Sequence, residues 1–255
     1  MGRIYIGTSG WSHKSWEKTF YPEDVPVSRH LEFYITQFLT VEINLTFYRL
    51  PAETIVQGWL RKAPPGFVYA VKGSRFITHM KKLANLDGAV DKFFDRIGPL
   101  KSRIGVILWQ LPPNLGKDTP RLAGFLAQLP RSYRYPVEFR HPSWLDEETF
   151  DLLRRHHAAH VSVSSLAMPM NLTVTSDLVY IRFHGLEHGA AHDYTRSELK
   201  PWAEHICHHH RAGKTVYVYF NNDANVRAPA NAKLLMQMTG QEPVQKPFER
   251  SRLAA

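Results

Sequence analysis

The chain has 255 residues, of which 44% are hydrophobic, a composition typical of a globular protein with a full core in one or two domains. No apolar run approaches the ~18 residues of a membrane-spanning helix. The single cysteine, Cys207, excludes an internal disulfide and fits a reducing cytosol. The formal net charge of +9 favours anionic partners such as nucleic acid, phosphorylated metabolites or an acidic protein. Since a strand-like segment at 3–7 follows the first residues without an apolar leader, we expect a cytoplasmic protein.

Short segments rich in β-branched and aromatic residues recur along the chain and predict eight strands. In chain order they are 3–7, 41–44, 67–72, 104–110, 135–140, 160–164, 178–184 and 215–221. Most of the intervening segments carry apolar residues at helical spacing. Eight strands that alternate with helices over about 250 residues are typical of a single (β/α)8 or TIM barrel, an α/β fold. An open doubly wound sheet is the alternative, but that architecture has no reason to stop at eight strands.

Two connections and the last residues depart from this alternation. The segment 165–177, between strands 6 and 7, is short and rich in Pro, Met and Asn, so we expect an irregular connection there. After the seventh strand, 185–194 is expected to form a loop over the site. Thr195 and Glu198 form a capping-box pattern that opens the next helix, which Gly213 would close. We assign 1–240 to one barrel domain and expect a flexible basic tail at 241–255.

The stretch V-E-F-R-H-P-S-W at 137–144 carries two opposite charges on one face of the fifth strand. Because side chains alternate along a strand, Glu138 and Arg140 share one face, and Val137 and Phe139 share the other. Charged side chains are rarely buried unless they are paired or face a wet cavity. The fifth strand should therefore end at a polar site.

The same alternation places polar side chains on the inward face of seven strands. In a barrel, the carboxyl ends of the strands and the loops that follow them meet at one mouth. The inward set, with two residues just beyond the strands, is Glu42, Asn44, Lys72, Gln110, Glu138, Arg140, Ser162, Ser164, Tyr180, Arg182, His184, Tyr219, Asn221, His141 and Asp223. For the deeper pair, Glu42 and Glu138, a purely structural network of buried ion pairs is the alternative to a catalytic role.

Seven motifs give the chain a resemblance to a known family. They are G-T-S-G-W-S at 7–12 with Trp16 and F-Y-P at 20–22, V-E-I-N-L-T-F-Y-R-L-P at 41–51, I-T-H at 77–79, Q-L-P-P at 110–113, V-E-F-R-H-P-S-W, R-F-H-G at 182–185 and Y-F-N-N-D at 219–223. Together they resemble the DUF72 (YecE-like) family from Gly7 to about Leu235. The resemblance implies a TIM barrel in a family whose activity is not established. Members of that family often carry an acidic residue at the end of the sixth strand, where this chain has Ser164 and Ser165.

Three cations at one mouth indicate an anionic substrate. Lys72, Arg140 and Arg182 would hold a phosphate or carboxylate, as in a phosphorylated compound, a phosphodiester or nucleic acid. Glu42 or Glu138 would act as base and His184 as acid in a phosphodiesterase-like hydrolysis, with one carboxylate ionised and burial keeping the other protonated. The remaining candidate substrate-binding residues are Asn44, Gln110, His141, Tyr219, Asn221, Asp223 and Trp11.

Two other interpretations stay open. Glu42, Glu138, His141, His184 and Asp223 are ligand types for a divalent metal, although no spacing motif fixes their geometry and the arginines beside them disfavour a cation. A non-catalytic module could instead hold nucleic acid or a protein in the same basic mouth, with Trp11 and Trp16 as stacking surfaces. The sequence indicates no membrane partner and no particular oligomeric state.

Overall fold

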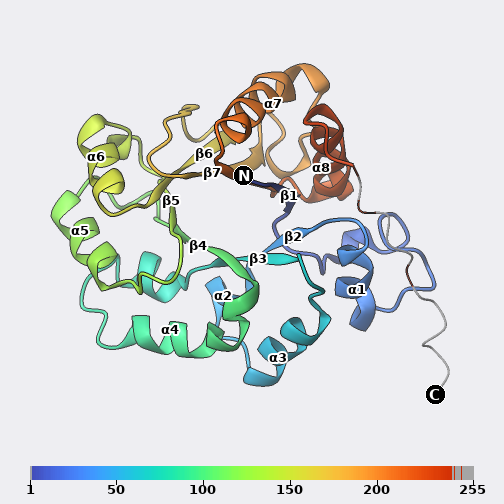
Figure 1. Ribbon diagram of the computed structural model, residues 1–255, viewed down its shortest axis with the longest axis horizontal. Coiled ribbons are helices and arrows are strands. Elements are labelled where there is room, and N and C mark those ends of the chain that lie inside the picture. Colours follow the sequence, from blue (N-terminus) through green and yellow to red (C-terminus); the bar gives the residue numbers. More distant parts are fainter. Residues whose placement is uncertain (1, 243, 245–247, 249–255) are drawn as a thin grey trace.

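The strands form one nearly closed parallel barrel. The computed structural model describes residues 2–242, 244 and 248. Over this part of the chain, eight parallel strands are hydrogen-bonded in the order β1-β8-β7-β6-β5-β4-β3-β2, with helices outside them (Figure 1). The strands are β1 (Ile4–Thr8), β2 (Thr40–Ile43), β3 (Val68–Lys72), β4 (Ile104–Gln110), β5 (Pro136–Glu138), β6 (Ala159–Ser165), β7 (Leu178–Gly185) and β8 (Thr215–Phe220). The predicted TIM-barrel fold is therefore confirmed.

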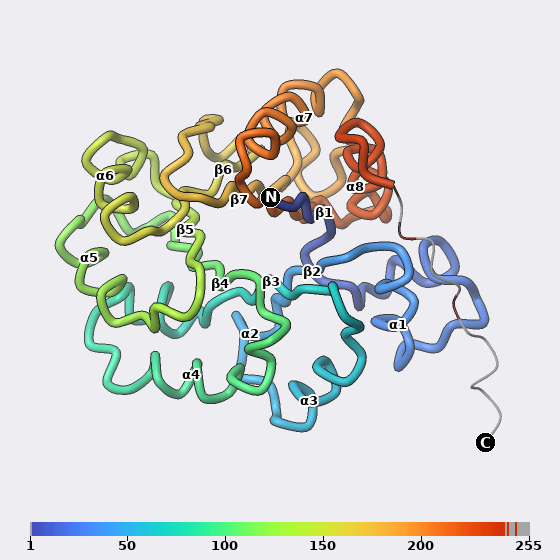
Figure 2. The backbone as a smooth tube through the Cα atoms, in the orientation of Figure 1, coloured from blue at the N-terminus to red at the C-terminus, as the bar shows by residue number. Residues whose placement is uncertain are grey.

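The barrel closes where the first two strands meet. Ser9, just after β1, forms an isolated parallel bridge with Glu42 of β2, and the Gly10 N–H donates to the Glu42 carbonyl at 2.9 Å. On its other side β1 pairs with β8 over its whole length. Figure 2 shows the consequence: the red helix α8 (Arg227–Met238) lies beside the blue first strand, so the ends of the barrel domain are neighbours.

Eight α-helices lie in the described residues, and most follow the strands as expected. They are α1 (His30–Ile35), α2 (Leu45–Tyr48), α3 (Glu53–Lys62), α4 (Ala89–Ile97), α5 (Thr119–Gln128), α6 (Glu147–Arg155), α7 (Arg196–Arg211) and α8. Short turns add to these, among them η3, a π-helical turn at Phe76–Met80. The predicted capping box is present at the start of α7, where the Thr195 hydroxyl accepts from the Glu198 N–H. The segment 166–177 contains no helix, so the irregular connection between β6 and β7 is confirmed.

Two apolar layers hold the barrel together. The outer layer lies between the strands and the helices and includes Leu122, Phe125 and Trp109. The inner layer fills the barrel with aromatic and small side chains, in which Tyr5 stacks on Tyr217 with ring centroids 5.1 Å apart. Because these rings occupy the interior near the amino ends of the strands, the polar side chains collect at the carboxyl ends.

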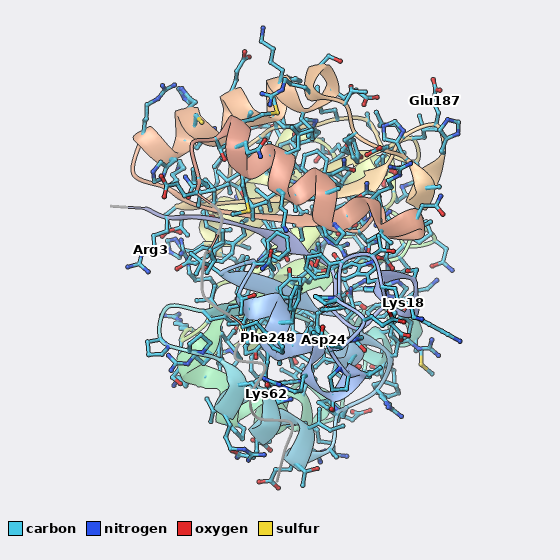
Figure 3. The ribbon with its side chains drawn as sticks, turned by 90° about the vertical axis from the view of Figure 1, so that its right-hand side faces the viewer. Arg3, Lys18, Asp24, Lys62, Glu187 and Phe248 are labelled. Carbon is cyan, nitrogen blue, oxygen red and sulfur yellow. The ribbon has the colours of Figure 1, made fainter. Side chains whose placement is uncertain are left out.

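The two ends of the barrel can be told apart in Figure 3. Arg3, which precedes β1, lies at the left of that view, whereas Lys18 and Glu187, from the loops after β1 and β7, lie at the right. The right-hand side is therefore the mouth.

Only part of the expected tail at 241–255 is described. Within it, the Phe248 ring packs against Phe33 with centroids 5.5 Å apart, and the Arg29 guanidinium lies 4.4 Å from the Phe248 ring centroid. Residues 243, 245–247 and 249–255 lie outside the described residues. Across the described part of the chain, every helix is too short or too polar to cross a bilayer.

The closure of the barrel depends on a glycine in β1. A Cβ atom at Gly7 would lie 2.4 Å from the Thr40 carbonyl oxygen, and a backbone atom cannot move aside as a side chain can. We expect Gly7→Ala to lower the free energy of unfolding by about 1–3 kcal/mol, measured by urea denaturation. Gly124→Ala is the matched control, because Gly124 is exposed in α5 with open space around it. It should raise stability by about 0.5–1 kcal/mol. Equal effects of the two substitutions would contradict the proposed close approach.

Candidate functional site

The centre of the mouth is a buried arginine held between two carboxylates. Arg182 of β7 donates from Nη2 to Glu42 Oε1 at 2.7 Å and from Nη1 to Glu138 Oε2 at 2.6 Å. These three side chains, called the inner network below, come from β7, β2 and β5 and are 1%, 0% and 0% exposed. The period-2 alternation of the strands explains why residues so far apart in sequence point to one place.

Neutral donors complete the inner network. Glu42 also accepts from the Ser9 hydroxyl at 2.8 Å and from the Tyr180 hydroxyl at 2.7 Å. Glu138 also accepts from the Gln110 amide at 2.8 Å. All four carboxylate oxygens therefore have partners, as buried polar atoms require.

Both carboxyl groups are ionised in this setting. Burial alone would raise the pKa of Glu42, but the charges of Arg182 and Lys72 outweigh it and lower that pKa. The pKa of Glu138 is likewise lowered well below its ordinary value, because Arg140 and Arg182 outweigh the effect of burial. The structure thus differs from the expectation that burial keeps one of the two carboxyls protonated, since the arginines compensate both.

A second layer lies above the inner network and is partly exposed. Arg140 donates from Nε to Glu138 Oε1 and from Nη2 to His184 Nε2, the latter at 2.7 Å. The other imidazole nitrogen, Nδ1, lies 3.2 Å from the Asn221 side-chain amide. Arg140, His184 and Asn221 are each partly buried, and of the three Asn221 lines the cavity described below.

The imidazole of His184 is neutral at physiological pH. Burial, together with the charge of Arg182, lowers the pKa of His184 to about 4. A guanidinium can only donate hydrogen bonds, so Nε2 accepts from Arg140 and the ring proton belongs on Nδ1. The Asn221 atom placed 3.2 Å from Nδ1 is Nδ2, so the side-chain amide turned by 180° would present its oxygen to that proton.

Lys72 differs from the other cations of the mouth. Its side chain, at the end of β3, is 8% exposed, and its ammonium lies 4.1 Å from the centroid of the Phe47 ring. Within the described residues, no carboxylate or other acceptor pairs with this ammonium. Burial and the nearby charge of Arg182 lower the pKa of Lys72 to about 8. The mouth therefore contains a desolvated cation without a hydrogen-bond partner, which is costly unless a ligand compensates it.

His79 joins the mouth although the strand pattern gave no sign of it. It lies in the π-helical turn η3, with its ring 4.9 Å from Phe47 and its Nδ1 2.8 Å from the Thr78 hydroxyl. Burial and the charges of Lys72 and Arg140 lower the pKa of His79, so this imidazole is also neutral. π-Helical turns are frequent at functional sites. The I-T-H motif at 77–79 was the available sequence signal.

A cavity of about 550 Å³ opens beside the inner network. This mouth cavity is lined by, among others, Ser9, Trp11, His13, Asn44, Tyr48 and Asn221. The Oδ1 atom of Asn44 is buried there and accepts no hydrogen bond from any described residue. Trp11, Asn44 and Asn221 of the predicted substrate-binding set thus face a space of the size usual for small-molecule sites.

Three other candidate residues lie elsewhere. Tyr219 is fully buried below the inner network, where its hydroxyl bonds to Thr40 at 2.6 Å, so burial removes it from substrate contact. His141 turns toward Ser143 and accepts from the Ser143 N–H at 3.2 Å. Asp223 accepts from the Trp16 indole at 2.9 Å and lies 2.5 Å from His13 Nδ1.

The expected metal ligands do not converge. His141 and Asp223 are engaged in the loops described above, Arg182 lies between the two carboxylates, and Arg140 lies between Glu138 and His184. Among the residues that the structure describes, no group of three or more His, Cys, Asp or Glu side chains is placed to hold a metal ion. The expected loop at 185–194 folds back on the strand ends, with the Tyr194 hydroxyl bonded to Ser164 and to the Gly185 N–H.

Removing the central cation should destabilise the fold. Arg182→Met would leave two buried carboxylates without their shared partner, which typically costs about 3–5 kcal/mol. We expect a lower urea midpoint, or loss of folded protein. Arg154→Met is the control, because Arg154 pairs with Glu147 and Asp151 on the exposed face of α6 and should leave the midpoint unchanged. Equal midpoints for the two variants would show that the inner network contributes nothing to stability.

Stability should also fall with pH between about 6.5 and 4. Burial lowers the pKa of both His184 and His160 to about 4, so the unfolded chain binds protons that the folded chain does not. Stability therefore decreases as pH falls through this window, by up to about 1.4 kcal/mol per pH unit for each group. His184→Gln should reduce the slope in urea titrations, whereas His188→Gln, in an exposed loop, should not. An unchanged slope in His184→Gln would contradict the neutral, buried state of His184.

Comparison with known proteins identifies relatives across most of the chain. The family model described as "Protein of unknown function DUF72" matches residues 5–253. UPF0759 protein YecE of Escherichia coli (strain K12) is 35% identical over 162 residues, which cover 62% of this chain and 57% of that protein. That match spans little more than half the length of the E. coli protein. UPF0759 protein YunF of Bacillus subtilis (strain 168) is 23% identical over 268 residues, covering 92% of this chain and 94% of that protein.

Solved structures show the same fold. A DUF72 family protein (TM1631) from Thermotoga maritima superposes with a TM-score of 0.84 and 32% identity, covering 94% of this chain and 100% of the other. A DUF72 family protein (EF0366) from Enterococcus faecalis has a TM-score of 0.80 at 18% identity, covers 96% of this chain and 99% of the other, and supports the fold alone. The resemblance that seven motifs indicated is confirmed, and the chain belongs to the DUF72 family.

Proposed function

We propose that the mouth binds an anionic group, of a phosphorylated compound or a phosphodiester, and that the protein is a hydrolase acting on it. The observation that carries this proposal is the buried ammonium of Lys72, which has no hydrogen-bond acceptor within the described residues. The centroid of the Phe47 ring lies 4.1 Å from this ammonium.

The charges of the mouth support an anionic ligand. Arg182, Arg140 and Lys72 supply three positive charges, and Glu42 and Glu138 supply two negative ones. Because His79 and His184 are neutral, one positive charge is left uncompensated. In a site shielded from water, such an excess is costly to maintain and is offset most directly by a bound anion.

The geometry suggests how the anion would be held. Lys72 would act as a point charge, and Arg140 would present N–H groups from the partly exposed side of the mouth. Asn44, whose buried Oδ1 lacks a partner, and Asn221 would orient the rest of the substrate by hydrogen bonds. Arg182 would act from below by fixing the two carboxylates, since it has almost no exposed surface.

The proposed chemistry is addition of water to phosphorus with cleavage of a P–O bond. The expected bases Glu42 and Glu138 have no exposed surface and would act as positioning residues through the arginines. The neutral imidazole of His79 would accept the proton of the attacking water at Nε2, because its Nδ1 is engaged by Thr78. His184, the expected acid, is neutral and its one lone pair already accepts from Arg140, so it would position Arg140. Lys72, whose pKa is about 8, would be mostly protonated at neutral pH and could give its proton to the leaving oxygen.

A non-catalytic binding module is the second candidate. It is favoured by the inner network, in which every carboxylate oxygen already has a partner and neither carboxylate is free to act as a base. In this version the same cations would hold the anion without turnover.

Binding can be tested with phosphate as the probe. We expect inorganic phosphate to raise the thermal unfolding midpoint above that in chloride of matched ionic strength, because a ligand of the folded state stabilises it. Lys72→Met, which removes the charge and keeps a long apolar side chain, should abolish the shift. Lys101→Met is the control, since Lys101 is exposed and precedes β4 at the opposite end of the barrel. A full shift in Lys72→Met would refute the proposal.

Turnover separates the two candidates. For an enzyme, His79→Gln should lower hydrolysis of p-nitrophenyl phosphate or bis(p-nitrophenyl) phosphate by about 10²–10⁴-fold while keeping the phosphate-dependent shift. Glutamine retains a hydrogen-bonding group for the Thr78 hydroxyl, so the variant removes the imidazole with little change to its surroundings. Wild-type protein that binds phosphate and hydrolyses neither probe would favour the binding module.

A further inference from the structure

A second cavity lies next to the mouth, among the segments that follow β2 and β3. This side groove, of about 420 Å³, is bounded by α2, by the π-helical turn η3 and by the start of α4. Tyr48 lines both the side groove and the mouth cavity, so the two spaces share one wall. Neither the inner network nor the side chain of Lys72 belongs to its lining.

The side groove presents large apolar side chains to solvent. Tyr48 is 65% exposed, Phe76 is 40% exposed and Met80 is 64% exposed. Exposed rings beside one cavity offer flat surfaces on which a planar ligand can stack. Single exposed apolar residues are common on proteins, but three around one cavity mark an interaction site.

Positive charge accompanies these rings. The basic residues of the lining are Arg49, Arg75, Lys81 and Lys92. Within the described part of the chain none of the four forms an ion pair, and Asp87 is the one acidic residue of the lining. The excess of three positive charges is available to a ligand because no described side chain forms an ion pair with these four cations.

The segment 82–87, of which Leu86 and Asp87 line the side groove, has an unusual backbone. Lys82, Leu83, Asn85 and Asp87 all have positive φ angles between 40° and 65°, a region that residues other than glycine rarely adopt. The segment is held in place because Leu83 and Leu86 are buried and the Leu83 N–H donates to the Ile77 carbonyl at 3.0 Å. Backbone strain of this kind clusters at ligand-binding sites, where the surrounding packing maintains it.

We propose that the side groove binds single-stranded nucleic acid, with bases stacked on Tyr48 and Phe76 and phosphates paired with the four basic residues. Stacking rings interleaved with cations are what a strand with unpaired bases requires. A duplex keeps its bases paired and cannot offer them to recessed rings. An acidic peptide would match the charge and leave the exposed rings unused. This inference is independent of the chemistry proposed for the mouth.

The test is fluorescence anisotropy with labelled twelve-nucleotide strands of deoxythymidine and of uridine, titrated with the full chain. We expect Tyr48→Ala or Phe76→Ala to weaken binding about tenfold, the usual effect of losing one base-stacking ring. Arg75→Gln should lower the slope of log affinity against log salt by about 0.7, the value for one lost phosphate contact on a single strand. Lys101→Gln is the charge-matched control and should change neither quantity.

Three results would overturn the proposal. The first is equal affinity for a duplex of the same length, and the second is complete competition by a poly-glutamate peptide at matched charge. The third is a loss of affinity in Lys72→Met as large as that in the ring variants, which would put the strand in the mouth. Circular dichroism of each variant shows whether it is folded, and a ring variant that is folded and binds normally also counts against the side groove.

Discussion

The position of Arg182 between two buried carboxylates is the constraint on which the rest of the mouth depends. One guanidinium fork joins β2, β5 and β7, so Glu42, Glu138 and Arg182 must lie at the same depth in the barrel for its geometry to be satisfied. Once both carboxylates are ionised, they hold Arg140 in place, and Arg140 in turn fixes the tautomer of His184. The charge that remains uncompensated is then that of Lys72, and the proposed ligand site follows from that imbalance.

Much of this arrangement could be predicted from the sequence. The spacing of apolar segments predicted eight strands and a barrel, and side-chain alternation predicted that Glu42, Glu138 and Arg182 would point to one place. The irregular connection at 166–177 was predictable because its Pro, Met and Asn residues cannot form an amphipathic helix. These predictions succeeded because strand periodicity is a local property that tertiary packing does not alter.

Depth and loop geometry could not be predicted in the same way. Alternation gives the face of a strand on which a side chain lies, but not its height, so Tyr219 was expected at the mouth and lies below it. His141 and Asp223 lie just beyond strands. The side chain of His141 is oriented by its hydrogen bond to the Ser143 N–H, and that of Asp223 by the indole of Trp16 from another loop. His79 reaches the mouth from a π-helical turn that no hydrophobic period indicates. Whether Lys72 has a hydrogen-bond partner depends on its distances to all the surrounding side chains, and a sequence does not contain these distances.

The tyrosines that fill the barrel below the mouth determine how a ligand can enter and leave. Tyr5, Tyr217 and Tyr180 are at most 8% exposed and pack the interior of the barrel below the mouth. A molecule that reaches Lys72 must therefore depart the way it arrived. If the mouth hydrolyses a phosphorylated compound, the product must diffuse out before the next substrate molecule can bind. Product release and product inhibition would then be part of the kinetics.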